Sequence, residues 1–288
     1  MISTYPFVSG KYLIGGNWYS SDKRTNVINP ANIDEIVGEV ALCTKEDVDH
    51  AIDTAEKAYE NWSRSDIEER ASNMHLAADE IKALVEENVT LLVRENGKVL
   101  VEAKKDLLRC VDIMHQAADE LLEWWKPEVV PGNQKVQIRK RARGVTAVIS
   151  PWNSPMILTF KRVIPAVLTG NTVVVKPATN CPLTIMSFLK VVASYFPAGV
   201  INVVTGSGSV IGEALCSDPR VKTIAFVGST ETGKDIMRAA SGTVKNLYME
   251  LGGNDAAIIL EDANLDEDSI KRLRFGVLRA AGQVCSAI

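Results

Sequence analysis

The chain has 288 residues, more than one compact domain usually contains, so one large or two smaller domains are expected. Apolar residues make up 46% and charged residues 24%, as in an ordinary globular protein. The net charge of −4 offers no basic field for nucleic acid or anionic lipid. No stretch approaches the roughly 20 uninterrupted apolar residues of a spanning helix. We therefore expect neither a nucleic-acid-binding protein nor a membrane protein.

Cysteine and histidine usage bears on redox setting and metal chemistry. The five cysteines are scattered without a C-x-x-C pair, and no secretory leader opens the sequence, which favours reduced thiols in a cytoplasmic setting. The three histidines lie in the first half, away from every glycine-rich turn. Since no Cys/His cluster has metal-ligand spacing, we expect no metal site and no catalytic histidine.

The first half of the chain is predicted to be mainly helical. Apolar side chains recur on one stripe over residues 45–62, and Thr44 stands where it can cap that helix. Similar spacing predicts helices over residues 65–93 and 99–125. Before them, residues 12–19 surround two glycines and predict a hairpin.

From Gly144 onward, short β-branched runs alternate with helical patterns. These runs lie at 145–149, 172–175, 200–204, 223–227 and 256–260. Such alternation is typical of parallel strands joined by crossover helices. The second half is therefore predicted to form a doubly wound, mostly parallel α/β sheet.

Between the halves, residues 127–143 carry two prolines, one glycine and a basic run. This composition predicts a protruding β arm rather than part of the core. Its charges are better explained by a solvated edge strand than by a binding patch.

Two glycine-rich turns follow predicted strands. Residues 226–234 predict a strand, a turn and a helix whose backbone N–H groups can face a nucleotide phosphate. The turn nearly satisfies G-x-x-x-x-G-K-[ST], but Asp235 stands where a P-loop needs a hydroxyl for Mg²⁺, so a P-loop NTPase is not predicted. The cluster at 206–212 has Ile211 where a dinucleotide fingerprint has its third glycine, and it predicts a tight turn that contacts a cofactor at most through its backbone.

Three polar side chains are candidate site residues. Asn153 and Lys176 end or follow predicted strands, at the edge where α/β proteins bind ligands, and Glu250 stands at the end of the run 244–249. Asn153, in Pro-Trp-Asn, can donate to a developing oxyanion or simply stabilise a turn. Lys176, before Pro-Ala-Thr, can bind ribose hydroxyls or phosphate or remain solvated. Glu250, before Leu-Gly-Gly, can act as a general base or be an exposed, hydrogen-bonded carboxylate. The residues alone leave these alternatives open.

Cys285 is the candidate reactive thiol. It follows a helical pattern over residues 266–281 and lies in the turn Gly-Gln-Val-Cys, off any apolar stripe, where a thiol is accessible. The other four cysteines are predicted to be structural: Cys43, Cys110, Cys181 and Cys216.

Taken together, these motifs occur in one order with consistent separations. Pro-Trp-Asn, Lys-Pro-Ala, the strand-linked G-x-x-x-x-G, Glu-Leu-Gly-Gly and Gly-Gln-x-Cys follow one another, and the phrase at 196–206 lies among them. This combination resembles the aldehyde dehydrogenase superfamily over nearly the whole chain. The resemblance implies a Rossmann-like cofactor domain and NAD(P)-dependent oxidation of an aldehyde to a carboxylic acid.

The resemblance also implies a covalent mechanism. The Cys285 thiolate attacks the aldehyde, and the oxyanion of the thiohemiacetal is held by the Asn153 amide and the Cys285 backbone N–H. Hydride transfer to the nicotinamide leaves a thioester. In the hydrolytic branches of the family, a glutamate matching Glu250 then activates the water that releases the acid.

A set of residues is expected to bind the cofactor by the same resemblance. These are Ser150, Pro151, Trp152, Lys176, Thr179, Gly206, Gly228, Ser229, Gly233 and Leu251. Thr179 stands where NAD-preferring members often carry a glutamate, so NAD and NADP both remain candidates. Arg162 stands where many members have lysine, and no role is assigned to it.

The resemblance divides the chain into three parts. Residues 1–126 and 144–250 are expected to form the cofactor-binding domain, residues 127–143 an oligomerisation arm, and residues 251–288 the start of an incomplete catalytic domain. Members of the family continue beyond the cysteine, so the sequence is expected to be truncated. A full-length version is expected to form a homo-oligomer. The alternative function is an inactive fragment that binds only nucleotide or partner subunits.

Overall fold

The computed structural model describes residues 9–130, 132, 136–285 and 287. A seven-stranded sheet crosses the centre, in the order β11-β10-β7-β8-β9-β1-β2. Its strands are β1 (Lys11–Ile14), β2 (Asn17–Ser20), β7 (Val145–Ile149), β8 (Thr172–Lys176), β9 (Ile201–Val203), β10 (Val221–Val227) and β11 (Asn246–Glu250). The last five are parallel, and the hairpin β1–β2 extends the sheet antiparallel to β9.

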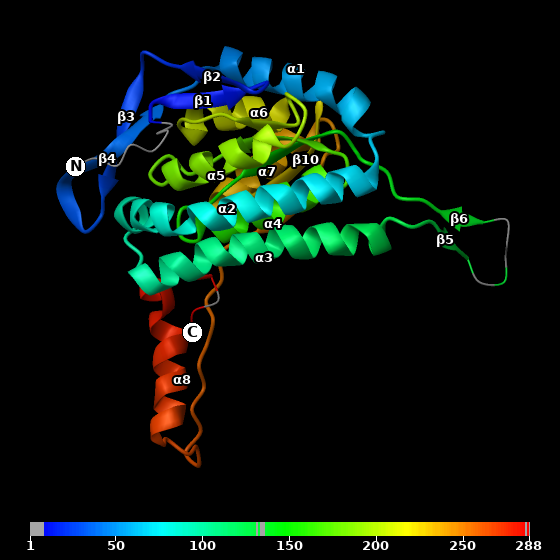
Figure 1. Ribbon diagram of the computed structural model, residues 1–288. Coiled ribbons are helices and arrows are strands. Elements are labelled where there is room, and N and C mark those ends of the chain that lie inside the picture. The colour runs from blue at the N-terminus through cyan, green and yellow to red at the C-terminus, as the bar shows by residue number, and fades with distance from the viewer. Residues whose placement is uncertain (1–8, 131, 133–135, 286, 288) are drawn as a thin grey trace.

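Helices cover both faces of the sheet (Figure 1). Those that follow the parallel strands are α4 (Pro155–Leu168), α5 (Leu183–Ser194), α6 (Glu213–Ser217) and α7 (Thr230–Ser241). Helices α4 and α5 bury their apolar sides on one face, and α6 and α7 on the other. Strand β8 serves both cores, because Val173 and Val175 point to one and Val174 to the other. The predicted doubly wound, mostly parallel sheet is confirmed.

The three long helices predicted for the first half are present. They are α1 (Lys45–Trp62), α2 (Ile67–Asn96) and α3 (Leu100–Trp124). Thr44 caps α1 in a reciprocal capping box, since its hydroxyl accepts from the Asp47 N–H and the Asp47 carboxylate accepts from the Thr44 N–H. The prediction missed a two-stranded ladder, β3 (Arg24–Asn29) and β4 (Asn32–Ala41), which packs beside α2 and α5.

The predicted arm protrudes from the body as a hairpin of β5 (Glu128–Val129) and β6 (Gln137–Ile138) (Figure 1). The side chains of both short strands are exposed. Lys140 pairs with Glu128 at 2.9 Å and lies over the Trp124 ring, 4.7 Å from its centroid. The basic run is thus a solvated edge whose lysine is tied back to the base of the arm.

After β11 the chain leaves the body. Residues 251–263 contain no helix or strand, and α8 (Glu267–Leu278) projects away from the sheet (Figure 1). The predicted strand at 256–260 is therefore wrong. A strand needs a neighbour to complete its backbone hydrogen bonds, and no described strand pairs with these exposed residues.

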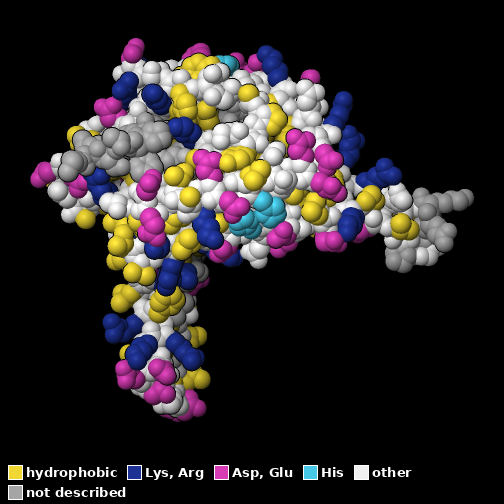
Figure 2. Space-filling model, in the orientation of Figure 1, with side chains coloured by type: hydrophobic (Ala, Val, Ile, Leu, Met, Phe, Trp, Pro, Cys, Tyr) yellow, Lys and Arg dark blue, Asp and Glu magenta, His cyan; other side chains and the backbone are white. Residues whose placement is uncertain are grey.

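The surface carries charges of both signs, interspersed over the face shown in Figure 2. Within the described part of the chain, no helix is both long enough and apolar enough to cross a membrane.

One buried carboxylate joins α2 to α5. Glu95 is 3% exposed and accepts hydrogen bonds from the backbone N–H groups of Leu183 and Thr184, at 2.7 and 2.8 Å. These N–H groups open α5, which has no side-chain cap of its own. Burial raises the pKa of Glu95 to about 7, against the opposing effect of these bonds.

Stability is expected to depend on pH through Glu95. Its pKa rises from 4.5 to about 7 on folding, so the folded state binds the proton more tightly. The stabilisation that protonated Glu95 gives the folded state is complete below its unfolded pKa of 4.5. It is lost as the pH rises through its folded pKa of about 7. We expect the unfolding free energy to fall across this window by about 3 kcal/mol relative to Glu95→Gln. Urea titrations over this pH range measure the difference, and parallel curves for the two proteins would contradict it.

Candidate active site

The carboxyl ends of the parallel strands meet at one edge of the sheet. Chain order runs from β7 through β8 to β9 on one side, then returns to β10 on the other side of β7. At such a reversal the loops separate and leave a crevice. The predicted residues at or just after these strand ends are Ser150, Pro151, Trp152, Asn153, Lys176, Thr179, Gly206, Gly228, Ser229, Glu250 and Leu251.

A groove of about 840 Å³ opens beside this edge, between the β9–α6 turn and α7. Ile149 and Lys176 line it from the sheet, and Ser209 lines it from the glycine cluster at 206–212. Thr232 and Arg238 of α7 form the opposite wall. Its volume suits a nucleotide-sized ligand.

Lys176 is the residue in this groove best placed to bind an anion or a hydroxyl. It is 6% exposed, and among the described residues its Nζ makes one hydrogen bond, of 3.4 Å to the carbonyl of Pro177. Burial lowers its pKa. A buried ammonium has three donors, so most of this capacity is open to a ligand.

Two other predicted cofactor residues contact each other. The Thr179 hydroxyl donates to the Gly206 carbonyl at 2.9 Å, which ties the loop after β8 to the loop after β9. Ser150 is buried, and its hydroxyl accepts from Thr159 at 2.7 Å. In this structure these three residues shape the edge of the sheet.

The glycine turn after β10 is explained largely by packing. Ser229 caps α7 by accepting from the Thr232 N–H. A Cβ at Gly228 would lie 2.5 Å from the Phe226 ring, and one at Gly233 would lie 2.6 Å from the Leu251 side chain. The groove between the β9–α6 turn and α7 is not lined by any of the four predicted cofactor residues in this region, which are Gly228, Ser229, Gly233 and Leu251.

Asn153 and the segment before Cys285 lie together. The Asn153 Nδ2 donates to the Gln283 carbonyl at 2.7 Å across 130 residues of sequence, and its Oδ1 accepts from the Ser154 N–H at 2.9 Å. One hydrogen of the amide remains for another acceptor. The structure thus brings the Pro-Trp-Asn loop to the Gly-Gln-x-Cys turn.

Cys285 differs from the other cysteines. All five lie within the described residues, and Cys285 alone is exposed. Burial raises the pKa of Cys43 to about 11 and that of Cys216 to about 12, which keeps both as thiols. The prediction that Cys285 is accessible agrees with the structure, and the four cysteines predicted to be structural are buried.

Glu250 lies in a different hollow from Asn153. Its carboxylate forms an ion pair with Arg162, whose side chain is 14% exposed. Both residues line a hollow of about 670 Å³ between α4 and one face of β10 and β11. Asn153 lines a separate hollow of about 200 Å³. The structure therefore does not place the Glu250 carboxylate in the hollow that Asn153 lines.

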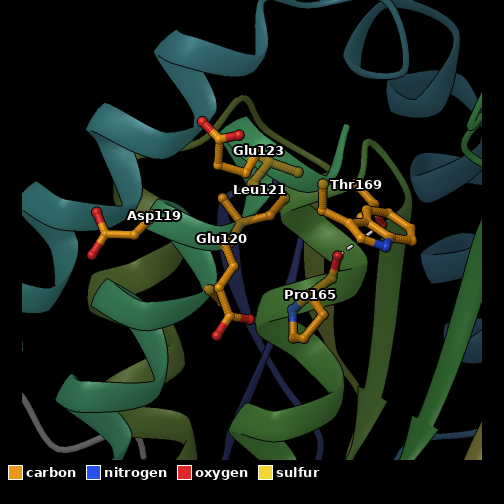
Figure 3. A pocket seen from close by; sticks show the side chains of 9 residues that line it. Asp119, Glu120, Leu121, Glu123, Pro165 and Thr169 are labelled. Atoms are coloured by element: carbon orange, nitrogen blue, oxygen red, sulfur yellow. Dashed lines mark hydrogen bonds between the residues drawn. The ribbon is translucent and has the colours of Figure 1, made fainter. Parts of the chain in front are cut away.

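A further hollow, of about 860 Å³, lies between α3 and α4 and contains no predicted site residue (Figure 3). Leu121 and Pro165 line it, with Glu120 and Glu123 at its edge. Within the described residues, no group of three or more His, Cys, Asp or Glu side chains is placed to hold a metal ion.

Sequence reasoning missed three residues that contact the candidate site. The motifs mark Arg162 only as a departure from the family pattern, and they give no signal for Asn96 or Glu102. Asn96 donates to the Trp152 carbonyl at 2.6 Å, and Glu102 accepts from the Ala280 N–H at 3.1 Å. The helix end at Asn96-Gly97 is visible in the sequence, but these long-range contacts leave no local signal.

Comparisons with known proteins show which family the chain resembles. Residues 18–288 match the family described as "Aldehyde dehydrogenase family". Alpha-ketoglutaric semialdehyde dehydrogenase of Bacillus subtilis is 36% identical over 95% of this chain and 57% of its own length. Mitochondrial succinate-semialdehyde dehydrogenase of Arabidopsis thaliana is 35% identical over 95% and 52%, respectively. The chain thus spans about half the length of the curated relatives it matches.

Solved structures give the same result. Betaine aldehyde dehydrogenase of Staphylococcus aureus in complex with NAD⁺ superposes with a TM-score of 0.91 at 32% identity, over 97% of this chain and 56% of its own. An NADP-dependent enzyme of E. coli superposes with a TM-score of 0.93 at 31% identity, over 100% and 60%. The chain belongs to the aldehyde dehydrogenase family.

Proposed function

We propose that this chain supplies the cofactor groove, the oxyanion donor and the nucleophile for NAD(P)-dependent oxidation of an aldehyde to a carboxylic acid. The observation that carries the proposal is the hydrogen bond from Asn153 to Gln283. It joins an amide donor at the sheet edge to the turn that bears the exposed Cys285. An accessible thiol beside a side-chain amide is the arrangement that acyl chemistry on cysteine needs.

In the first half-reaction, the Cys285 sulfur bonds to the aldehyde carbon, and the carbonyl oxygen becomes an oxyanion. The hydrogen of the Asn153 amide that Gln283 does not use, together with the Cys285 backbone N–H, stabilises that charge. A nicotinamide cofactor in the groove lined by Lys176 would supply the acceptor for the hydride that leaves this carbon. The carbonyl re-forms as a thioester on Cys285.

In the second half-reaction, water cleaves the thioester to give the acid and the free thiol. Glu250 is the proposed base for this water. Its carboxylate pairs with Arg162 in this structure, so hydrolysis requires that it turn away from the guanidinium. The Arg162 ion pair therefore separates the resting carboxylate from the acylation site.

NAD and NADP are both supported as the cofactor. The relatives described above include a complex with NAD⁺ and an NADP-dependent enzyme. Lys176 supplies buried donors for ribose hydroxyls or phosphate, while Glu213 and Asp235 add carboxylates to the same groove. Thr179 brings no carboxylate to repel a 2′-phosphate.

The three-part division of the chain remains part of this proposal. Residues 1–126 and 144–250 form the cofactor domain, and residues 251–288 begin the catalytic domain. The arm, residues 127–143, presents an exposed hairpin suited to a neighbouring subunit in a homo-oligomer. Five unpaired thiols support a reducing, cytoplasmic setting.

An inactive fragment that binds nucleotide or partner subunits is the second candidate. It is favoured by exposed apolar side chains around β11 and α8, where Tyr248, Phe275 and Leu278 are 60 to 63% exposed. The two candidates differ in whether aldehyde oxidation accompanies cofactor binding.

Replacing the nucleophile tests the activity. We expect Cys285→Ala to lower aldehyde-dependent reduction of the cofactor at least about a thousandfold, since no other cysteine is exposed. Trp152 is 46% exposed beside the cofactor edge, so its fluorescence is expected to report unchanged cofactor affinity in the variant. Equal turnover in both proteins would overturn the assignment of Cys285. Cofactor binding without turnover in the unsubstituted chain would favour the second candidate.

Replacing the groove lysine tests the cofactor site. We expect Lys176→Met to weaken binding of NAD⁺ or NADP⁺ about tenfold or more, because it removes buried donors that the protein itself hardly uses. Lys82→Met, at an exposed position on α2, is the matched control. Fluorescence titration gives both affinities, and equal values in the two variants would place the cofactor elsewhere.

A further inference from the structure

The corner between α2 and α3, residues 95–102, lies beside both loops of the candidate active site. Figure 1 shows the ends of α2 and α3 at this corner next to the C-terminal end of α8. A hollow of about 200 Å³ is lined jointly by this corner, Asn153 and the segment 280–283. The Asn153 loop and the segment 280–283 thus face the corner across a small void, so packing alone does not hold these two loops in place.

The corner itself is firmly fixed. Gly97 ends α2 in the left-handed region, at φ 82°, where glycine is favoured. Glu95 accepts from two N–H groups at the start of α5. Lys98 pairs with Asp106 at 2.5 Å, and their side chains are only 5% and 16% exposed. Anchors on both sides make the corner a stable support.

Asn96 connects the corner to the oxyanion loop. Its Nδ2 lies 2.6 Å from the Trp152 carbonyl oxygen and 3.5 Å from the Cys181 sulfur. Trp152 directly precedes Asn153, so a bond to its carbonyl fixes the peptide from which the Asn153 side chain projects. Removing this donor leaves the loop free to shift.

Glu102 connects the corner to the cysteine turn. Its Oε1 accepts from the Ala280 N–H at 3.1 Å. Ala280 and Ala281 have φ values of 49° and 56°, in the left-handed region that side chains other than glycine rarely occupy. Such a conformation persists only where surrounding contacts enforce it. The Glu102 contact acts at the start of this strained turn, five residues before Cys285.

We propose that the α2–α3 corner positions both halves of the catalytic centre. Asn96 acts through the Trp152 carbonyl on the oxyanion donor, and Glu102 acts through Ala280 on the nucleophile. Both are positioning residues, because each acts through another residue and not on the substrate. The inference rests on the proposed function only in treating Asn153 and Cys285 as donor and nucleophile.

The Asn96 contact is tested with two reactions of the same thiol. Oxidation of propanal with NAD⁺ or NADP⁺ requires the oxyanion donor. Alkylation by iodoacetamide does not, because the sulfur–carbon bond forms as iodide leaves and no carbonyl oxygen gains charge. We expect Asn96→Ala and Asn96→Asp each to slow the first-turnover burst of reduced cofactor about tenfold, with alkylation changed less than about twofold. Asn61→Ala, at an exposed site near the end of α1, is the control.

The Glu102 contact is tested with a matched pair. Glu102→Ala removes the acceptor and frees the turn, so alkylation of Cys285 is expected to be about threefold faster while the burst is slower. Glu102→Gln keeps an oxygen that accepts from the Ala280 N–H, so it is expected to restore both rates. A general loss of stability would not move the two rates in opposite directions.

The outcomes separate the two proposals. Equal bursts in Asn96→Ala and Asn61→Ala, or identical behaviour of Glu102→Gln and Glu102→Ala, would overturn the inference while the proposed function stands. If the unsubstituted protein shows no burst with either cofactor, the proposed activity fails for this chain. The inference about the corner is then tested only by the alkylation rates of Glu102→Ala and Glu102→Gln, and equal rates in these two variants would overturn it.

Discussion

The reversal of strand order between β7 and β10 is the constraint on which the rest of the arrangement depends. Parallel strands all present their carboxyl ends at one edge, and right-handed crossovers place α4 and α5 on one face and α6 and α7 on the other. The loops after β7 and β10 must therefore separate. Lys176 and Asn153 lie at this edge because of that topology, although neither contacts the other.

The edge of the sheet fixes only one side of the candidate site. The proposed nucleophile, Cys285, lies in a turn at the end of a projecting helix, beyond the last strand. Such a turn has no ladder of its own to hold it, and it contains two alanines in a left-handed conformation. Among the described residues, hydrogen bonds to Glu102 and Asn153 connect this turn to the body. The sheet edge thus positions Asn153, and the α2–α3 corner positions the turn that carries Cys285.

The sequence predicted the elements whose signal is local. The parallel strands β7 to β10 are short apolar runs with mostly buried side chains, and the long helices show clear stripes, so both were found. Strand β11, whose side chains are partly exposed, was not among the predicted strands. The β3–β4 ladder was missed because few of its apolar side chains are buried, namely those of Val27, Val37, Val40 and Ala41. The strand at 256–260 was predicted wrongly because pairing partners do not show in a local pattern. For the same reason, the candidate residues were found by motif, whereas the contacts of Asn96, Glu102 and Arg162 were not.

The ion pair between Arg162 and Glu250 bears on the proposed hydrolysis step. The guanidinium of Arg162 neutralises the charge of the Glu250 carboxylate and holds it in a hollow that Asn153 does not line. In the proposed mechanism, this pair delays water activation until the carboxylate leaves Arg162. Arginine holds such a carboxylate more firmly than lysine, because its planar guanidinium can bond both oxygens. Within the proposed mechanism, arginine at this position therefore favours a thioester that persists until Glu250 is released.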